Sequence, residues 1–239
     1  MKVIINTPEK IAELAAEQYV ELLKSKPNAI LGLATGSTPL ALYAKLAALH
    51  KENKLSFKDA TSFNLDEYVG LAPTHDQSYK YFMMHNLFQY MDLPENRIHV
   101  PSGLDISVDT LEAYDRDIEK AGGIDLQLLG IGNNGHIGFN EPGTAFGSKT
   151  HVVELTEDTR KVNSRFFASL DEVPTHAATM GIKTVMHARS VILIALGSAK
   201  APAIQKTVNG PVTEAVPASI LQLHPDCTVY CDEAAAALL

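Results

Sequence analysis

Short apolar runs alternate with longer amphipathic segments along the whole chain. An apolar run of about 4–8 residues between polar turns indicates a buried strand, and apolar residues at i, i+3 and i+4 indicate a helix that packs on a core. The pattern predicts strands at residues 2–5, 29–33, 60–65, 97–100, 124–130, 177–181, 191–196 and 228–231. It predicts helices at residues 8–25, 39–53, 77–91, 108–121, 157–167 and 199–208.

Strands and helices that alternate in this way are typical of βα units around a parallel sheet. We therefore predict an α/β fold, a single-domain open and mostly parallel sheet flanked by helices, over residues 1–239. The stretch from residue 132 to 149 stands out because it has no predicted helix or strand. Loops of this length are usually functional or disordered, and its spaced chemical residues favour function.

Charge and hydropathy exclude several classes of partner. The formal charge is -8, and the sequence has no clustered basic stripe of the kind that a nucleic-acid surface needs. No apolar run approaches the ~20 residues of a membrane span, and the first residues lack the apolar core of a signal peptide. We expect a cytoplasmic protein that acts on a small soluble molecule.

Two cysteines, Cys227 and Cys231, lie in one predicted strand. At ~3.3 Å per residue they would be ~13 Å apart, which is beyond the ~7 Å limit for a disulfide. We expect buried thiols. Neither cysteine has a partner at zinc spacing, so no metal site is assigned.

The run GIGNNGHIGFNEP at residues 130–142 directly follows the apolar stretch 124–129. In open α/β sheets, ligands bind at the carboxyl ends of strands. His136 brings a base that titrates near neutral pH, and Glu141 lies far enough along the loop to fold back and orient the imidazole. A lone histidine is more often structural, but the glycines and Asn133, Asn134 and Asn140 favour acid/base chemistry here.

The second predicted strand leads into ATGSTP at residues 34–39. Small residues, the hydroxyls of Thr35, Ser37 and Thr38, and the N–H groups at a helix start would form an anion cradle suited to a phosphate. The sequence is not a P-loop, which disfavours a nucleoside triphosphate. The alternative is that these are turn and N-cap residues, with Pro39 at the first helical position.

The third predicted strand ends in the carboxylate pair Asp66 and Glu67. Desolvation of such a pair is costly unless each carboxylate is paired or used. Successive strand residues point to opposite faces, so at most one of the two can enter a given site. We expect one to be a base and the other to be structural; the alternative is a helix cap and a salt bridge.

Two cations are candidates for the same anion site. Arg165 lies in a predicted helix, and Lys200 lies at the start of another one after a strand. Either cation could close the site around Thr35–Thr38. The alternative for each is a solvated surface charge.

Seven motifs occur in one order along the chain: TGSTP (35–39), FNLDEYVGL (63–71), GIGNNGHIGFNEP (130–142), NSRFF (163–167), GSAKA (197–201), LQLHP (221–225) and CDE (231–233). Together they closely resemble the glucosamine-6-phosphate deaminase family over nearly the whole chain. The resemblance implies a Rossmann-like fold of the sugar-phosphate isomerase type. It also implies conversion of D-glucosamine 6-phosphate and water to D-fructose 6-phosphate and ammonia, without a metal or organic cofactor.

The same resemblance assigns roles to individual residues. Asp66 would take the C2 proton and return it to C1, and His136, held by Glu141, would open the sugar ring. Positions that match Gly36, Ser37, Arg165 and Lys200 hold the 6-phosphate in the family.

The chain departs from some members of that family. Asn134 stands where some of them carry Asp, and an amide can orient or hydrogen-bond but cannot exchange protons at neutral pH. Hexameric members bind N-acetylglucosamine 6-phosphate at an allosteric site, whose positions match Thr144, His151 and Val153 here. We therefore expect a non-allosteric enzyme, and a monomer.

Two other functions compete with this prediction. A 6-phosphogluconolactonase-like hydrolase would share the fold and the phosphate site, but its loop usually reads differently from GHIGFNEP, in which Glu141 is retained. A non-enzymatic sugar-phosphate-sensing module would not need Asp66, His136 and Glu141. The presence of these three residues therefore favours the deaminase.

Overall fold

The computed structural model describes residues 1–239 and every side chain except that of Phe166. Its main sheet has seven strands in the order β1-β10-β9-β6-β2-β3-β5, and every neighbouring pair is parallel. A smaller antiparallel sheet has the order β4-β8-β7. The strands are β1 Lys2–Ile5, β2 Ile30–Leu33, β3 Thr61–Asn64, β4 Asp66–Tyr68, β5 Ile98–His99, β6 Leu126–Leu129, β7 His151–Glu154, β8 His176–Thr179, β9 Ser190–Ala195 and β10 Cys227–Cys231.

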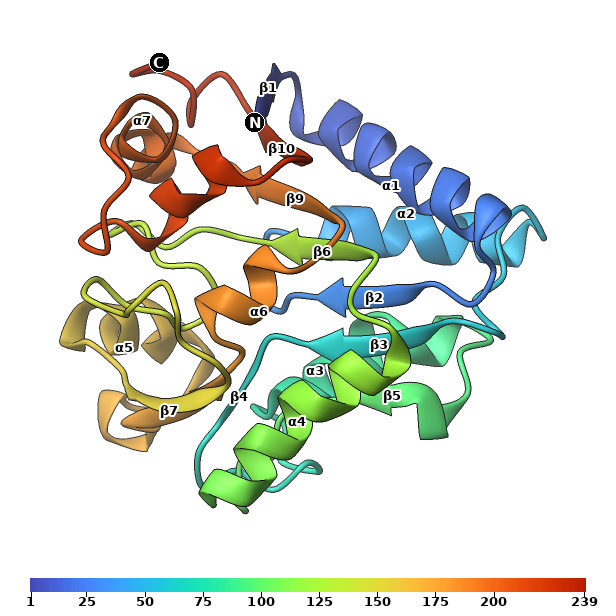
Figure 1. Cartoon of the computed structure of the whole chain (residues 1–239), viewed down its shortest axis with the longest axis horizontal. Coiled ribbons are helices and arrows are strands. Elements are labelled where there is room, and N and C mark those ends of the chain that lie inside the picture. The colour runs from blue at the N-terminus through green and yellow to red at the C-terminus, as the bar shows by residue number, and fades with distance from the viewer.

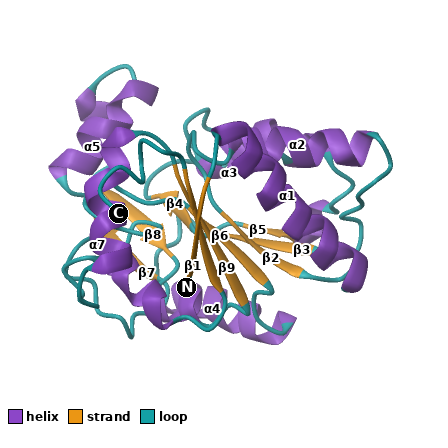
Figure 2. Cartoon of the chain, turned by 90° about the horizontal axis from the view of Figure 1, so that it is seen from above, coloured by secondary structure: helices purple, strands orange, loops and turns teal.

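Helices cover both faces of the main sheet. α1, α2 and α3 lie on one face and α4 lies on the other, as the view from above shows (Figure 2). The α-helices are α1 Pro8–Ser25, α2 Leu40–Lys51, α3 Tyr79–Asn86, α4 Val108–Ala121, α5 Glu157–Asn163, α6 Ile182–Met186 and α7 Ala201–Asn209. Short 3₁₀ helices lie at Phe88–Tyr90, Glu95–Arg97, Ser164–Phe166, Leu170–Glu172, Ser198–Lys200 and Pro217–Leu223.

Local sequence explains where the long helices begin, end and face the core. Thr7 caps α1 by accepting from the backbone N–H of Lys10, and Pro8 occupies the first turn, where its missing N–H costs nothing. α4 ends at Gly122, whose φ of 106° is left-handed. In α1, the buried Ile11, Ala15, Tyr19 and Leu23 recur every fourth residue, which forms one apolar stripe against the sheet.

The strand order places the ends of β2 and β6 side by side. From β2 the chain continues toward β3 and β5, whereas from β6 it continues toward β9 on the other side. This is a topological switch point, where the connections diverge and leave room for a ligand at the carboxyl ends of the strands. The arrowheads of β2, β3 and β6 point toward the same side of the molecule, where α5 lies (Figure 1).

The predicted fold class is confirmed: an open parallel sheet is flanked by helices. The predicted boundaries of α1 and α4 agree with the structure, as do those of β1. Three elements were not predicted: β4, β7 and α6. β4 and β7 are short and have little period-2 alternation of their own, so only their pairing with β8 makes them strands.

The helix predicted at 39–53 is Leu40–Lys51, and three other predicted helices are also shorter than expected. The helix predicted at 77–91 ends at Asn86, the one at 157–167 ends at Asn163, and the one at 199–208 begins at Ala201. In each case a 3₁₀ turn occupies the remainder, a frequent form of helix end. Both cysteines are buried free thiols, as expected, and burial raises the pKa of Cys227 to about 12. Among the described residues, none of the helices is both long and apolar enough to cross a membrane.

Candidate active site

Four segments that follow neighbouring strands meet at the switch point. They are the loop 34–39 after β2, β4 after β3, the loop 130–148 after β6, and the start of α7 after β9. Because parallel strands end at one edge of the sheet, residues that are far apart in sequence come together here. The four segments carry the cradle, the carboxylate pair, His136 with Glu141, and Lys200.

Glu141 is the centre of a hydrogen-bond network. Its Oε2 lies 3.3 Å from His136 Nδ1 and accepts from Asn134 Nδ2 at 2.6 Å. Its Oε1 accepts from the hydroxyls of Thr159 at 2.5 Å and Thr156 at 3.2 Å. The carboxylate therefore joins the loop to the first turn of α5.

These contacts determine the charge state of Glu141. Burial alone would raise the pKa of this carboxyl, but the hydrogen bond and charge of His136, with further hydrogen bonds from Thr159 and Asn134, lower the pKa to about 2. Glu141 is thus a carboxylate at any working pH. Since it faces Nδ1, the imidazole presents Nε2 as the nitrogen that can exchange a proton with a ligand.

Asn134 acts on both partners at once. Besides donating to Glu141, it accepts the backbone N–H of His136 on Oδ1 at 3.1 Å. The His136 ring lies against Gly132, where a Cβ would approach three ring atoms to within 2.5 Å. Any larger residue at that position would displace the imidazole from Glu141.

The two hydroxyl donors to Glu141, Thr156 and Thr159, were not predicted from the sequence. Thr156 is recognisable in the sequence as an N-cap residue before Glu157, and it does accept from Thr159 N at 3.2 Å. Nothing local indicates that these hydroxyls donate to a carboxylate that lies 15 and 18 residues away in the chain.

The carboxylate pair is divided between two tasks. Glu67 accepts backbone N–H groups of Tyr68 at 2.8 Å, Tyr79 at 2.9 Å and Lys80 at 3.0 Å, and so caps the start of α3. Burial raises the pKa of Glu67, and these donors oppose that shift. Asp66 is 6% exposed, and no hydrogen bond reaches its carboxylate from the described residues.

The environment of Asp66 makes it a strong carboxylate base. Burial, followed by the negative charge of Glu67, raises the pKa of Asp66 to about 8. A Cβ on Gly138 would lie 3.6 Å from Asp66 Oδ2 and 3.0 Å from the hydroxyl of Thr179. Asp66 therefore borders the loop that carries His136, although the two residues follow different strands.

The two candidate cations, Lys200 and Arg165, lie within electrostatic reach of each other. Lys200 Nζ donates to Asn133 Oδ1 at 2.8 Å, which ties the start of α7 to the loop after β6. Burial lowers the pKa of Lys200, and the positive charge of Arg165 lowers it further. Two cations held within electrostatic reach of each other disfavour one another unless an anion lies between them.

The structure contradicts part of the alternative interpretation of residues 35–39, in which the hydroxyl residues are N-caps and Pro39 is the first helical residue. α2 begins at Leu40, Pro39 is the residue before it, and among the described residues no side chain caps this helix. The hydroxyls of Ser37 and Thr38 are thus not used as helix caps. Burial raises the pKa of the Tyr79 phenol well above its usual range, and the Thr35 hydroxyl opposes that shift.

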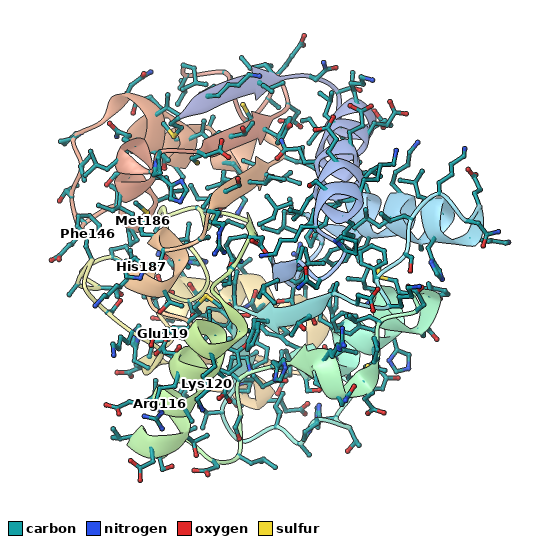
Figure 3. The ribbon with its side chains drawn as sticks, turned by 45° about the vertical axis from the view of Figure 1, so that its right-hand side comes forward. Arg116, Glu119, Lys120, Phe146, Met186 and His187 are labelled. Carbon is teal, nitrogen blue, oxygen red and sulfur yellow. The ribbon has the colours of Figure 1, made fainter. Side chains whose placement is uncertain are left out.

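A separate cavity of about 280 Å³ lies at the amino end of β6, away from this edge. It is lined by Asp115, Ile118, Glu119, Gly122, Gly123, Ile124, Lys149, Lys183, Thr184 and His187. Figure 3 shows Glu119 on α4 and His187 at the end of α6 on this part of the molecule. None of the predicted site residues lines it. Among the described side chains, no group of three or more His, Cys, Asp or Glu residues could hold a metal ion.

Nearly the whole chain matches one protein family and is similar to known members of it. Residues 6–230 match the family described as glucosamine-6-phosphate isomerases/6-phosphogluconolactonase. The chain is 49% identical to a glucosamine-6-phosphate deaminase of Thermoanaerobacter pseudethanolicus, with 100% of this chain and 95% of that protein covered. It is 56% identical to a glucosamine-6-phosphate deaminase of Lachnoclostridium phytofermentans, with 86% of this chain and 88% of that protein covered.

Two solved structures separate close from distant similarity. A monomeric glucosamine-6-phosphate deaminase superposes with a TM-score of 0.97 at 44% identity, over 100% of both chains. A 6-phosphogluconolactonase from Trypanosoma cruzi superposes with a TM-score of 0.80 at 20% identity, over 100% of this chain and 96% of that one. The second similarity concerns the fold alone.

Proposed function

Because the chain belongs to the family of glucosamine-6-phosphate isomerases and 6-phosphogluconolactonases, we propose that it is a glucosamine-6-phosphate deaminase. It converts D-glucosamine 6-phosphate and water to D-fructose 6-phosphate and ammonia. The observation that carries the proposal is the convergence of three groups at one edge of the sheet. These are a buried carboxylate without a hydrogen-bond donor among the described residues, a histidine oriented by a carboxylate, and a pair of cations, one of which is tied to the loop that carries the histidine.

The first step is capture of the phosphate. Thr35, Gly36, Ser37 and Thr38 supply hydroxyls and backbone N–H groups, while Arg165 and Lys200 supply positive charge. A bound dianion relieves the repulsion between the two cations, so phosphate binding is favoured by the way the site is charged. A phosphate held in one place positions C1 and C2 of the sugar for reaction.

The second step opens the pyranose ring. Proton abstraction next to a carbonyl needs the acyclic aldehyde, so the C1 hydroxyl must lose its proton while the ring oxygen gains one. His136 performs this transfer through Nε2. Glu141 fixes the ring through Nδ1 and stabilises the imidazolium that forms, and Asn134 holds Glu141 in place.

The third step moves a proton and releases the nitrogen. Asp66 removes the C2 proton, which gives an intermediate with a C1–C2 double bond that carries the C1 oxygen and the C2 nitrogen. Asp66 returns the proton to C1, which leaves an imine at C2. Water adds at C2, ammonia leaves, and the ketose remains, so the atoms balance. A carboxyl with a pKa of about 8 is a far better base than an exposed aspartate.

We also propose that the protein works as a monomer without the allosteric site of hexameric relatives. The similar structure at 44% identity is described as monomeric. Thr144, at one of the positions matched to that allosteric site, donates its hydroxyl to the carbonyl of Glu141 at 2.7 Å and is thereby engaged in the loop. Sigmoidal kinetics, or activation by N-acetylglucosamine 6-phosphate, would contradict this part of the proposal.

One assay tests the proposed reaction against the two competing functions. Purified protein is incubated with glucosamine 6-phosphate, and fructose 6-phosphate and ammonia are measured; 6-phosphogluconolactone is offered in parallel. We expect equimolar ammonia and fructose 6-phosphate and no acceleration of lactone hydrolysis. Lactone hydrolysis without ammonia release would support the hydrolase, and binding without either reaction would support a sensing module.

A further inference from the structure

A side-chain contact joins the segment that carries Arg165 to the strand that carries Asp66. Asn163 is the last residue of α5, and its Nδ2 donates to the hydroxyl of Tyr68 at 2.8 Å. Tyr68 is the last residue of β4, two positions after Asp66. The contact therefore links a candidate phosphate ligand with the candidate base through two residues that need not touch the substrate.

Tyr79 extends this link to α3. Its ring centroid lies 4.7 Å from that of Tyr68, with the two ring planes tilted by 43°. The backbone N–H of Tyr79 is itself fixed by Glu67 at 2.9 Å. Tyr79, Tyr68 and Asn163 thus connect α3, β4 and α5 through one ring contact and one hydrogen bond.

Aromatic packing holds Tyr68 rigidly at the centre of this chain. The Phe139 ring, from the loop of His136, lies 5.7 Å from the Tyr68 ring, and the Phe167 ring lies 5.7 Å away in an edge-on arrangement. Tyr68 is 2% exposed, and burial raises its pKa to about 12, so the phenol stays neutral at working pH. A neutral, closely packed phenol is suited to fixing positions and not to proton transfer.

α5 depends on such contacts for its position. The helix has only seven residues, and helices this short are not stable without tertiary contacts. Its first turn is joined to Glu141 through Thr159, and its last residue is joined to Tyr68 through Asn163. Both ends of α5 are therefore attached to groups of the site.

We propose that Asn163, Tyr68 and Tyr79 are positioning residues that fix the Arg165 segment relative to the cradle and to Asp66. This inference rests on the proposed function, because it takes the bound anion to be the 6-phosphate of the substrate. The unit sets the distance between the phosphate ligands and the base, so that C2 of a substrate anchored by its phosphate reaches Asp66. Its loss weakens phosphate binding and misplaces C2, without removing any group that reacts.

The test uses the variants Tyr68→Phe, Asn163→Ala and the double variant. Tyr230→Phe is the matched control, since it also removes a phenol that accepts from a side-chain amide, that of Gln18 at 2.6 Å, in β10 and α1. Inorganic phosphate binding is measured by calorimetry on each full-length protein. KM and kcat for glucosamine 6-phosphate are measured separately, and circular dichroism checks that each variant is folded.

We expect Tyr68→Phe and Asn163→Ala each to weaken phosphate binding and to raise KM by about three- to tenfold, the effect of one lost hydrogen bond. The double variant Tyr68→Phe with Asn163→Ala should bind phosphate about as tightly as the more impaired of the two single variants, because both changes remove the same contact. Tyr230→Phe should match the wild type. A merely structural loss would lower the folded fraction and leave KM and phosphate affinity unchanged.

Wild-type phosphate affinity in Tyr68→Phe and Asn163→Ala would overturn the positioning role, as would fully additive losses in the double variant. The proposed function is tested separately by ammonia release from the wild-type protein. If ammonia is not released but phosphate binding depends on Tyr68 and Asn163, the proposed function fails and the positioning unit stands.

Discussion

Asp66 and Glu67 are adjacent carboxylates in β4 that lie in opposite chemical environments. Glu67 accepts two backbone N–H groups at the start of α3 and the N–H of Tyr68, whereas Asp66 is buried without a hydrogen-bond donor among the described residues. Burial raises the pKa of Asp66 to about 8, and the neighbouring negative charge of Glu67 contributes to that rise. One residue therefore secures the helix and at the same time adjusts the basicity of its neighbour.

Replacement of Asp66 by Asn should abolish most turnover. The side chain keeps its shape but can no longer accept the C2 proton, so kcat should fall by about 10²- to 10⁴-fold, the usual contribution of a general base. The measurement is steady-state ammonia release, with inorganic phosphate binding as the control that the cradle is intact. Turnover close to that of the wild type would refute the assignment of Asp66 as the base.

The same variant should be more stable than the wild type at alkaline pH. The pKa of Asp66 is raised on folding, so the folded protein binds more protons than the unfolded chain between about pH 4 and pH 8. Wild-type stability should therefore decline as pH rises through this window, and Asp66→Asn removes the decline. We expect the stability difference between variant and wild type to grow by about 4 kcal/mol from pH 5 to pH 9. Urea denaturation at several pH values measures it; a constant difference would argue against a raised pKa.

Loss of the Glu67 carboxylate should affect stability and pH dependence together. Glu67→Ala leaves two N–H groups at the start of α3 without this acceptor, which should cost about 1–2 kcal/mol of unfolding free energy. It also removes a negative charge that raises the pKa of Asp66, so the rise of kcat/KM with pH should move to lower pH. Glu67→Gln is the matched control, because it removes the charge but keeps one acceptor oxygen. It should show the pH shift with a smaller loss of stability.

A second carboxylate next to Glu141 should change its titration. In Asn134→Asp, a donor that lies 2.6 Å from Glu141 Oε2 becomes an acceptor, so the two carboxylates must share a proton. The pKa of Glu141, followed by NMR of its side-chain carboxyl carbon, should then be higher than in the wild type, where it is about 2. Asn134→Ala removes the donor without adding charge and should raise this pKa less. An identical Glu141 pKa in all three proteins would show that Asn134 does not govern the state of Glu141.

Removal of one cation should weaken substrate capture more than it slows chemistry. Lys200→Met keeps the stem of the side chain and loses the charge, so KM for glucosamine 6-phosphate should rise by about 10- to 100-fold, the range for a charged hydrogen bond. The rise should shrink at high salt, which screens the wild-type interaction. Lys206→Met, an exposed lysine on α7, serves as the control and should leave KM unchanged. An unchanged KM in Lys200→Met would place the phosphate elsewhere.

The sequence by itself determined the order of strands and helices and the loops that carry the chemistry. Apolar periodicity and helix caps are local properties, so α1 and α4 could be predicted with their full boundaries. The rule that ligands bind at the carboxyl ends of parallel strands then pointed to the loops after β2, β3 and β6. β4 and β7 could not be predicted in this way, because short strands with little alternation of their own form only where a partner strand is present.

Only the tertiary structure decided how the groups of the site act on one another. Which of Asp66 and Glu67 is left without a donor depends on where the start of α3 packs, and a pKa depends on burial that no local pattern encodes. The hydroxyls that reach Glu141 and the contact between Asn163 and Tyr68 join residues that are many positions apart. Hydrogen bonds and charge interactions depend on distances of a few ångströms, and such distances exist only once the chain has folded.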